Sequence, residues 1–197
     1  MMARAWCSKG RVVAGVVGPA LITCLTACGG SAAKPAGIAP EQAVDYIHAV
    51  IEADRSVYAE RVVQRLQNTE GVIKASEHFE ADKALPLPAQ MLRMGSQAAA
   101  EKGDFRYALI SQWAINKANL PKTDAEKAGM EQVIADPSKP YRSYLTVNGR
   151  RYFMAIYADR AVSPACVKCH NEHQESPRHD FTPGDVMGGV VVTLPLD

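Results

Sequence analysis

The chain has 197 residues, of which 47% are hydrophobic, and its 22 basic and 21 acidic residues give a formal net charge of +1. This length and apolar content predict one globular domain once a targeting segment is removed. The near-neutral charge argues against a nucleic-acid partner, because phosphate binding requires a surplus of basic residues.

Residues 1–27 have the pattern of a bacterial lipoprotein signal peptide, with basic residues at the start and an uncharged, mostly apolar stretch over 12–27. The sequence Leu-Thr-Ala-Cys at 25–28 resembles a lipobox, whose cysteine becomes the lipidated first residue. We therefore expect Cys28 to carry lipid, residues 28–38 to form a tether, and the protein to be exported to the periplasm or cell envelope and anchored in a membrane. An ordinary signal peptide or an uncleaved anchor, with incidental cysteines, is the alternative.

The domain is expected to span residues 39–197 and to begin with a long helix. Pro40 suits the first turn of a helix. Apolar residues then recur at the spacing of one helical face, which we expect to pack against the rest of the domain. They are Ala43, Ile47, Val50, Ile51, Val57, Tyr58, Val62 and Leu66.

The rest of the domain mixes helices and strands without strict alternation, which favours an α+β fold with an antiparallel sheet. Helices are expected over 89–102 and from about 124 to 135, and strands over 105–112, 144–147, 152–157 and 186–194. Thr123, with Glu126 three residues later, forms a capping box before the second of these helices. Asn148 and Gly149 lie between two β-rich runs and predict a hairpin turn.

Residues 166–170 have the sequence Cys-Val-Lys-Cys-His, which matches the c-type haem attachment motif. In this motif Cys166 and Cys169 form thioethers to the two vinyl groups of one haem, and His170 binds iron as the proximal ligand. We therefore expect one covalent haem c. Export supports this prediction, because thioether formation in bacteria occurs outside the cytoplasm.

Two other interpretations of the motif stay open. A thioredoxin-like redox pair would need a βαβ context with the cysteines at a helix start, and no such pattern precedes Cys166. A structural zinc site would need further ligands, which His170, His173 and His179 could supply.

Several short stretches occur in order along the chain: residues 54–55, 58, 62–63, 84–89, 111–116, 165–171, 176–177 and 184–188. In these stretches the chain resembles a family of PAS-like c-type haem domains of unknown function, first recognised in a cyanobacterial protein and found as periplasmic sensor domains of chemoreceptors and cyclases. The resemblance implies a PAS-like antiparallel sheet, a long N-terminal helix, flanking helices, and haem attached near the last strand.

The second axial position of the iron decides the function, since a strong ligand favours electron transfer and a vacant or weak one admits small gases. Some relatives use a cysteine of their N-terminal region as this second ligand. This chain cannot, because after processing its only cysteine there is Cys28, which is expected to carry lipid. The other candidates are His48, His78, His173, His179 and the methionines. We predict His78, because similar sequences carry a histidine at this place; His173 follows His170 too closely to reach the other face. A solvated histidine is the alternative, and His48 is the second choice.

Other side chains have two interpretations each. The aromatic residues Trp113, Tyr107, Phe153 and Tyr157 would line a haem pocket or fill the sheet core. Arg160 or Arg178 would pair with the haem propionates or stay solvated.

Two functions from different classes follow from these predictions. The first is a haem module that senses redox state or a diatomic gas and signals to a separate partner protein. The second is an electron-transfer cytochrome. An enzymatic, peroxidase-like role is the least expected, because the sequence identifies no distal acid/base pair.

Overall fold

The computed structural model describes residues 37–196, so the predicted signal peptide, Cys28 and most of the tether lie outside the described residues. The elements are α1 (Pro40–Val57), η1 (Tyr58–Thr69), β1 (Ala75–Ser76), α2 (Phe79–Asp82), β2 (Leu85–Pro86), α3 (Pro88–Ala100), β3 (Arg106–Ile110), η2 (Lys117–Asn119), α4 (Asp124–Ala135), β4 (Tyr141–Val147), β5 (Arg150–Arg160), α5 (Pro164–Glu172) and β6 (Val186–Pro195). No helix within this part of the chain is long and apolar enough to span a membrane.

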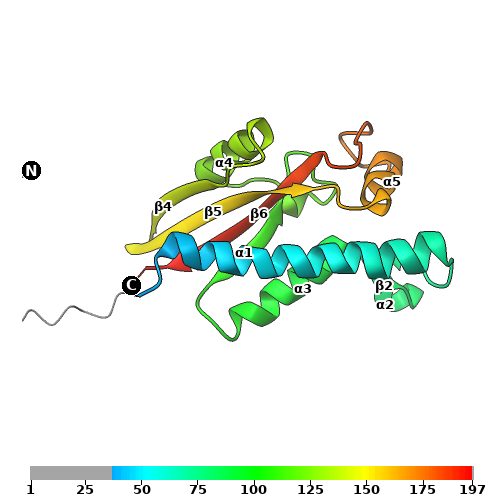
Figure 1. Cartoon of the computed structure of the whole chain (residues 1–197), viewed down its shortest axis with the longest axis horizontal. Coiled ribbons are helices and arrows are strands. Elements are labelled where there is room, and N and C mark those ends of the chain that lie inside the picture. Colours follow the sequence, from blue (N-terminus) through cyan, green and yellow to red (C-terminus); the bar gives the residue numbers. More distant parts are fainter. Residues whose placement is uncertain (1–36, 197) are drawn as a thin grey trace, which may run out of the picture. The chain divides into compact units, whose positions relative to one another are not determined.

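The domain begins with one long helical segment, as predicted (Figure 1). Its first 18 residues are α-helical, and the 12 residues of η1 continue it with π-helical hydrogen bonding. The expected apolar face was wrong at two positions, because Val50 and Val57 are 62% and 58% exposed. The buried side instead runs through Val44, Arg55, Ala59 and Val63, in multiples of about 3.6 residues.

The main sheet has four strands in the order β3-β6-β5-β4, all antiparallel. Asn148 and Gly149 connect β4 to β5 with φ values of +51° and +80°, the left-handed conformation that a two-residue hairpin turn requires. A second, parallel sheet consists of the short strands β1 and β2. The predicted α+β fold, with an antiparallel sheet, a long N-terminal helix and flanking helices, is confirmed.

Alternate residues of the strands point to opposite faces of the main sheet, and each face has its own core. On one face Phe153 and Val192 pack against Val44 of α1. On the other face Ile156 packs against Met130 of α4. The predicted capping box begins α4: Thr123 Oγ1 accepts from the Glu126 amide at 3.1 Å, and the Glu126 carboxylate accepts from the Thr123 amide at 2.9 Å.

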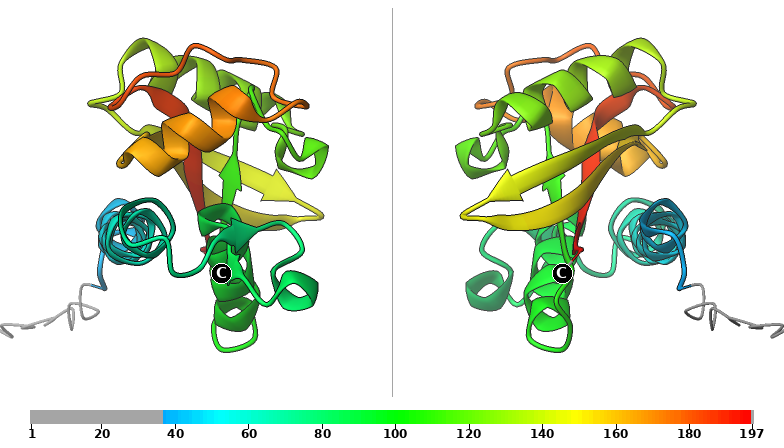
Figure 2. Two further views of the ribbon diagram at one scale, coloured as in Figure 1. Left: turned by 90° about the vertical axis from the view of Figure 1, so that its right-hand side faces the viewer. Right: turned by 90° about the vertical axis from the view of Figure 1, so that its left-hand side faces the viewer.

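Helix α5 follows β5 at one end of the sheet, near η1 (Figures 1 and 2). The sequence predicted no helix here. Pro164 occupies its first turn, and a loop then leads to β6. A third cluster of buried side chains, made of Ala161, Phe181 and Met187, lies against the partly buried Trp113, Cys166 and Val167.

Candidate functional site

The motif at residues 166–170 lies entirely within α5. Cys166, Cys169 and His170 are therefore at positions i, i+3 and i+4, which share one side of a helix. Cys166 is three residues after the N-cap Ser163, whose Oγ lies 3.4 Å from the Cys166 sulfur. The cysteine pair lies in the first half of α5, but β5 and β6 are antiparallel, so the motif is not part of a βαβ unit, in agreement with the sequence.

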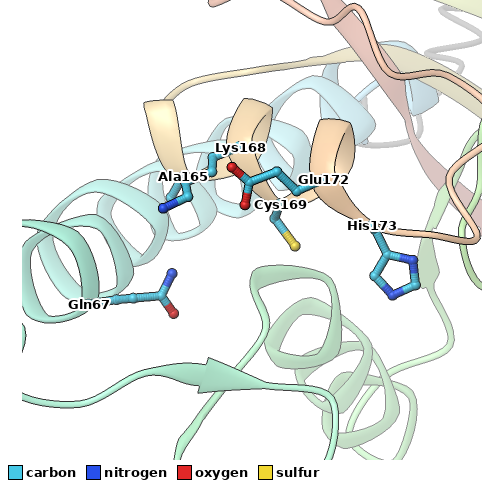
Figure 3. Close-up of a pocket in the computed structure, with 6 residues that line it drawn as sticks. All are labelled: Gln67, Ala165, Lys168, Cys169, Glu172 and His173. Carbon is cyan, nitrogen blue, oxygen red and sulfur yellow. The ribbon is translucent and has the colours of Figure 1, made fainter.

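Cys169 lies at a hollow of about 290 Å³ between α5 and η1. Its lining residues are Gln67, Ala165, Lys168, Cys169, Glu172 and His173. Figure 3 shows the Cys169 sulfur pointing away from α5 into this space, with Gln67 of η1 and His173 on either side of it. The hollow is thus open beside one of the two motif thiols.

The surroundings of Cys169 keep its sulfur protonated. Burial raises the pKa of the Cys169 thiol, and Glu77, Cys166 and Glu172 raise it further. The topology disfavours the thioredoxin-like interpretation, because β5 and β6 are antiparallel and no βαβ unit surrounds the motif.

The His170 imidazole lies in an apolar environment on the same helix. Its ring packs edge-to-face on Phe181, with centroids 5.8 Å apart and planes at 88°. Burial lowers the pKa of His170, and the positive charge of Arg55 and the neighbouring His173 lower it further. Among the described residues, Nδ1 of His170 is buried and has no hydrogen-bond partner.

Asn171, directly after the motif, fixes the position of Phe181. Its Nδ2 donates to the Phe181 carbonyl at 2.9 Å, and its Oδ1 accepts from the Phe181 amide at 3.0 Å. This two-point contact holds the ring against His170. Sequence reasoning did not predict it, because Phe181 is ten residues away in an irregular loop.

His78, the predicted sixth ligand, is exposed and immediately precedes α2. It is not among the residues that line the hollow. Its neighbour Glu77, however, brings a carboxylate oxygen to 3.4 Å from Nε2 of His173, at the end of α5. The segment that carries His78 therefore lies next to the end of α5.

His48 belongs to a different part of the domain. Its ring stacks on Tyr157 of the sheet, with centroids 3.7 Å apart and planes at 8°. It is seven residues before Arg55 on α1, about 10 Å along the helix axis. The structure does not bring it to the motif.

The remaining two histidines make local contacts. His173 Nδ1 accepts from the Glu175 amide at 3.1 Å, and His179 Nδ1 is 2.9 Å from the Asn171 carbonyl oxygen. Within residues 37–196, no three His, Cys, Asp or Glu side chains are grouped so that they could hold a metal ion. The zinc interpretation therefore lacks a ligand set in the described chain.

Of the candidate pocket aromatics, only Trp113 lies near the motif, where it packs on Phe181 with centroids 5.8 Å apart. Tyr107, Phe153 and Tyr157 belong to the sheet core, which was the alternative interpretation. The candidate arginines are held locally. Arg178 binds Asp180 at 2.6 Å and Asp185 at 3.2 Å, and Arg160 donates to the Gly184 carbonyl at 3.0 Å.

A buried ion pair near the motif was missed from the sequence. Arg55 Nη2 donates to Asp159 Oδ2 at 2.7 Å, and each residue is 8% exposed. A signal existed, since Arg55 is a charged residue on the buried side of an amphipathic helix. The helical pattern alone could not supply its partner, which is 104 residues away.

Comparison with known proteins identifies the family of this chain. The model of the Tll0287-like family (Tll0287) matches residues 36–195. The chain belongs to the Tll0287-like family. A similar solved structure is that of the cyanobacterial heme-protein Tll0287, with 14% identity and a TM-score of 0.52 over 81% of this chain and 98% of that chain. No curated protein matches. The family resemblance inferred from the sequence is confirmed, and this member of the Tll0287-like family shares the fold of Tll0287.

Proposed function

We propose that this protein binds one haem c covalently through Cys166 and Cys169, with His170 as the proximal iron ligand. The observation that carries the proposal is the placement of both thiols and the imidazole on one side of α5. Tll0287, which shares the fold, is described as a heme-protein. A haem supplies an iron centre that alternates between ferrous and ferric states and has a second axial position.

The residues of the site fit such a group. Two thiols and an imidazole are the donors that c-type attachment requires. Burial lowers the pKa of His170 and so favours the neutral imidazole, which is the form that binds a metal. Phe181, fixed by Asn171, restricts rotation of the imidazole and so orients it in advance.

The test is a pyridine haemochrome assay on denatured, acid-acetone-extracted protein. Wild type should retain haem, and Cys166→Ala with Cys169→Ala should lose it. Lys168→Ala, on the same helical turn, serves as the control and should retain it. His170→Ala should alter the iron spectrum. Absence of a haemochrome in wild type would refute the proposal, and zinc should then be assayed.

We infer that His78 is the sixth ligand. The Glu77–His173 contact supports this assignment, because it brings the segment of His78 to the end of α5. The protein should then be low-spin in both oxidation states and bind carbon monoxide slowly. His78→Ala should shift the ferric spectrum toward high spin, while His48→Ala should leave it unchanged. The reverse result would transfer the assignment to His48.

We propose sensing of redox state or of a diatomic gas as the biological role. Electron transfer is the second candidate, and edge-to-face contacts from His170 through Phe181 to the partly exposed Trp113 favour it. Optical spectra of the reduced protein with and without carbon monoxide separate gas sensing from the roles that depend on redox state alone. Rapid binding supports gas sensing, and unchanged spectra support electron transfer or redox sensing.

We also propose that Cys28 is lipidated and anchors the protein in a membrane of the cell envelope. The lipobox at residues 25–28 supports this. Mass spectrometry should find a diacyl or triacyl Cys28 at the mature N-terminus, and Cys28→Ser should release or misprocess the protein. A mature protein that begins elsewhere and carries no lipid would contradict the proposal.

A further inference from the structure

The buried ion pair between Arg55 and Asp159 connects α1 to β5 next to the proposed haem site. A buried ion pair is seldom more stabilising than apolar side chains of similar size, because the cost of removing both charges from water offsets most of their attraction. Apolar side chains would join the helix to the sheet at least as well. Packing of α1 on β5 therefore does not explain why a charged pair is buried here.

Both partners lie where the backbone departs from regular geometry. The long helix changes from α- to π-helical bonding at Tyr58, three residues after Arg55. The pairing of β5 with β6 shifts register between Asp159 and Arg160. Such irregularities redirect side chains and are frequent at functional sites. Here one irregularity begins three residues after Arg55, and the other includes Asp159.

The ion pair lies beside the motif on both of its elements. Arg55 is three residues before η1, which packs against α5, and Asp159 is two residues before Ala161, a member of the cluster that packs against Cys166. In agreement with this placement, the charge of Arg55 helps to lower the pKa of His170. Nη2 of Arg55 donates a hydrogen bond to Asp159, but Nε of Arg55 is buried without a hydrogen-bond partner in the described chain. In the described chain, the only other buried side-chain polar atom without a partner is His170 Nδ1.

We propose that Arg55 is a fixed positive charge that raises the reduction potential of the haem. Asp159 is the positioning residue that holds the Arg55 guanidinium in place. The inference rests on the proposed haem attachment at His170. Ferric haem carries one more positive charge than ferrous haem, so a nearby cation favours the reduced state. The effect is large in a buried site, because the low dielectric screens it little.

The test is spectroelectrochemical titration of the haem-loaded protein at pH 7. Arg55→Gln should lower the midpoint potential and Arg55→Lys should leave it close to wild type. Asp159→Asn should raise it, because the cation loses its counter-charge while an acceptor oxygen remains. Arg65→Gln, an exposed arginine on η1, is the control and should shift the potential least.

Opposite signs for the Arg55 and Asp159 variants separate this role from a structural one, in which both variants would loosen the same contact and shift the potential alike. Shifts of the same sign, or none beyond the control, would overturn the proposal. If Arg55→Gln does not fold, Asp159→Asn decides, and a potential at or below wild type refutes it. Failure of haem attachment itself appears separately, as a missing haemochrome in wild type.

Discussion

At the scale of single residues, His48 packs against the sheet core. Its ring stacks on Tyr157, and its side chain is 13% exposed. Burial lowers the pKa of His48, and Glu52 and Asp45 oppose that shift. The neutral imidazole is therefore the form that the fold prefers.

The pH dependence of stability follows from this shift. The folded state binds the His48 proton less readily than the unfolded state, whose pKa is about 6.5, so stability falls as the pH drops below that value. His48→Phe keeps the stacking and should remove this loss. Chemical denaturation between pH 7 and pH 5 should give a shallower decline for the variant. His179→Gln is the control, and an identical pH dependence in wild type and His48→Phe would contradict the prediction.

The motif formed by Cys166, Cys169 and His170 can be recognised from local spacing alone, and its role in haem attachment stays a prediction. The partnership of Arg55 with Asp159 was not predictable in this way, since it arises only when α1 packs on the far end of β5. Nor could the sequence assign His78 or His48 to a side of the domain before the fold was known.

At the scale of elements, the local signals were the most informative. The capping box at Thr123 and the Asn148–Gly149 turn each satisfy backbone requirements within a few residues, so they were predicted at the right places. Helix α5 was missed, because its nine residues include Cys, Val and His, which are weak helix formers. Packing on Phe181 and Met187, which come later in the chain, supports this helix.

The link between α5 and the following loop depends on Asn171. Its side chain makes two hydrogen bonds to the Phe181 backbone, and each contributes about 1 kcal/mol. Asn171→Ala should therefore lower the free energy of unfolding by about 2 kcal/mol, as urea denaturation would measure. Asn68→Ala, which removes two exposed side-chain hydrogen bonds on η1, is the control. Equal losses in the two variants would refute the role given to Asn171.

Strand β6 approaches β3 closely at Gly188. A Cβ there would lie 2.5 Å from the Ile110 carbonyl oxygen and 3.3 Å from Cβ of Ser111, so Gly188→Ala must push the backbones apart. We expect a loss of about 1–3 kcal/mol in the free energy of unfolding, typical of overpacking. Gly37→Ala, which meets nothing within 4 Å, should be neutral. A thermal melt of each variant checks this, and a neutral Gly188→Ala would show that the strands can adjust.

At the scale of the whole domain, the sheet core and the proposed haem site are separate. The two larger apolar clusters, around Phe153 and around Ile156, include no residue of α5. Among the buried clusters of residues 37–196, only the small one of Ala161, Phe181 and Met187 contacts the motif, through Cys166 and Val167. The sheet with α1 and α4 thus forms a scaffold, and α5 with its loop forms the part that haem attachment would order.

This separation predicts how the protein responds when attachment is prevented. In Cys166→Ala with Cys169→Ala, the sheet should keep its fold, because neither large cluster loses a contact. Helix α5, the loop over 173–181 and the end of η1 beside the hollow should loosen, because they lose the group that joins them. Hydrogen exchange should quicken at least about tenfold in these segments, roughly 1.4 kcal/mol of local stability, and stay unchanged in β5 and β6. Lys168→Ala, with both cysteines present, is the control. Faster exchange throughout the domain would mean instead that the haem belongs to the same cooperative unit as the sheet core.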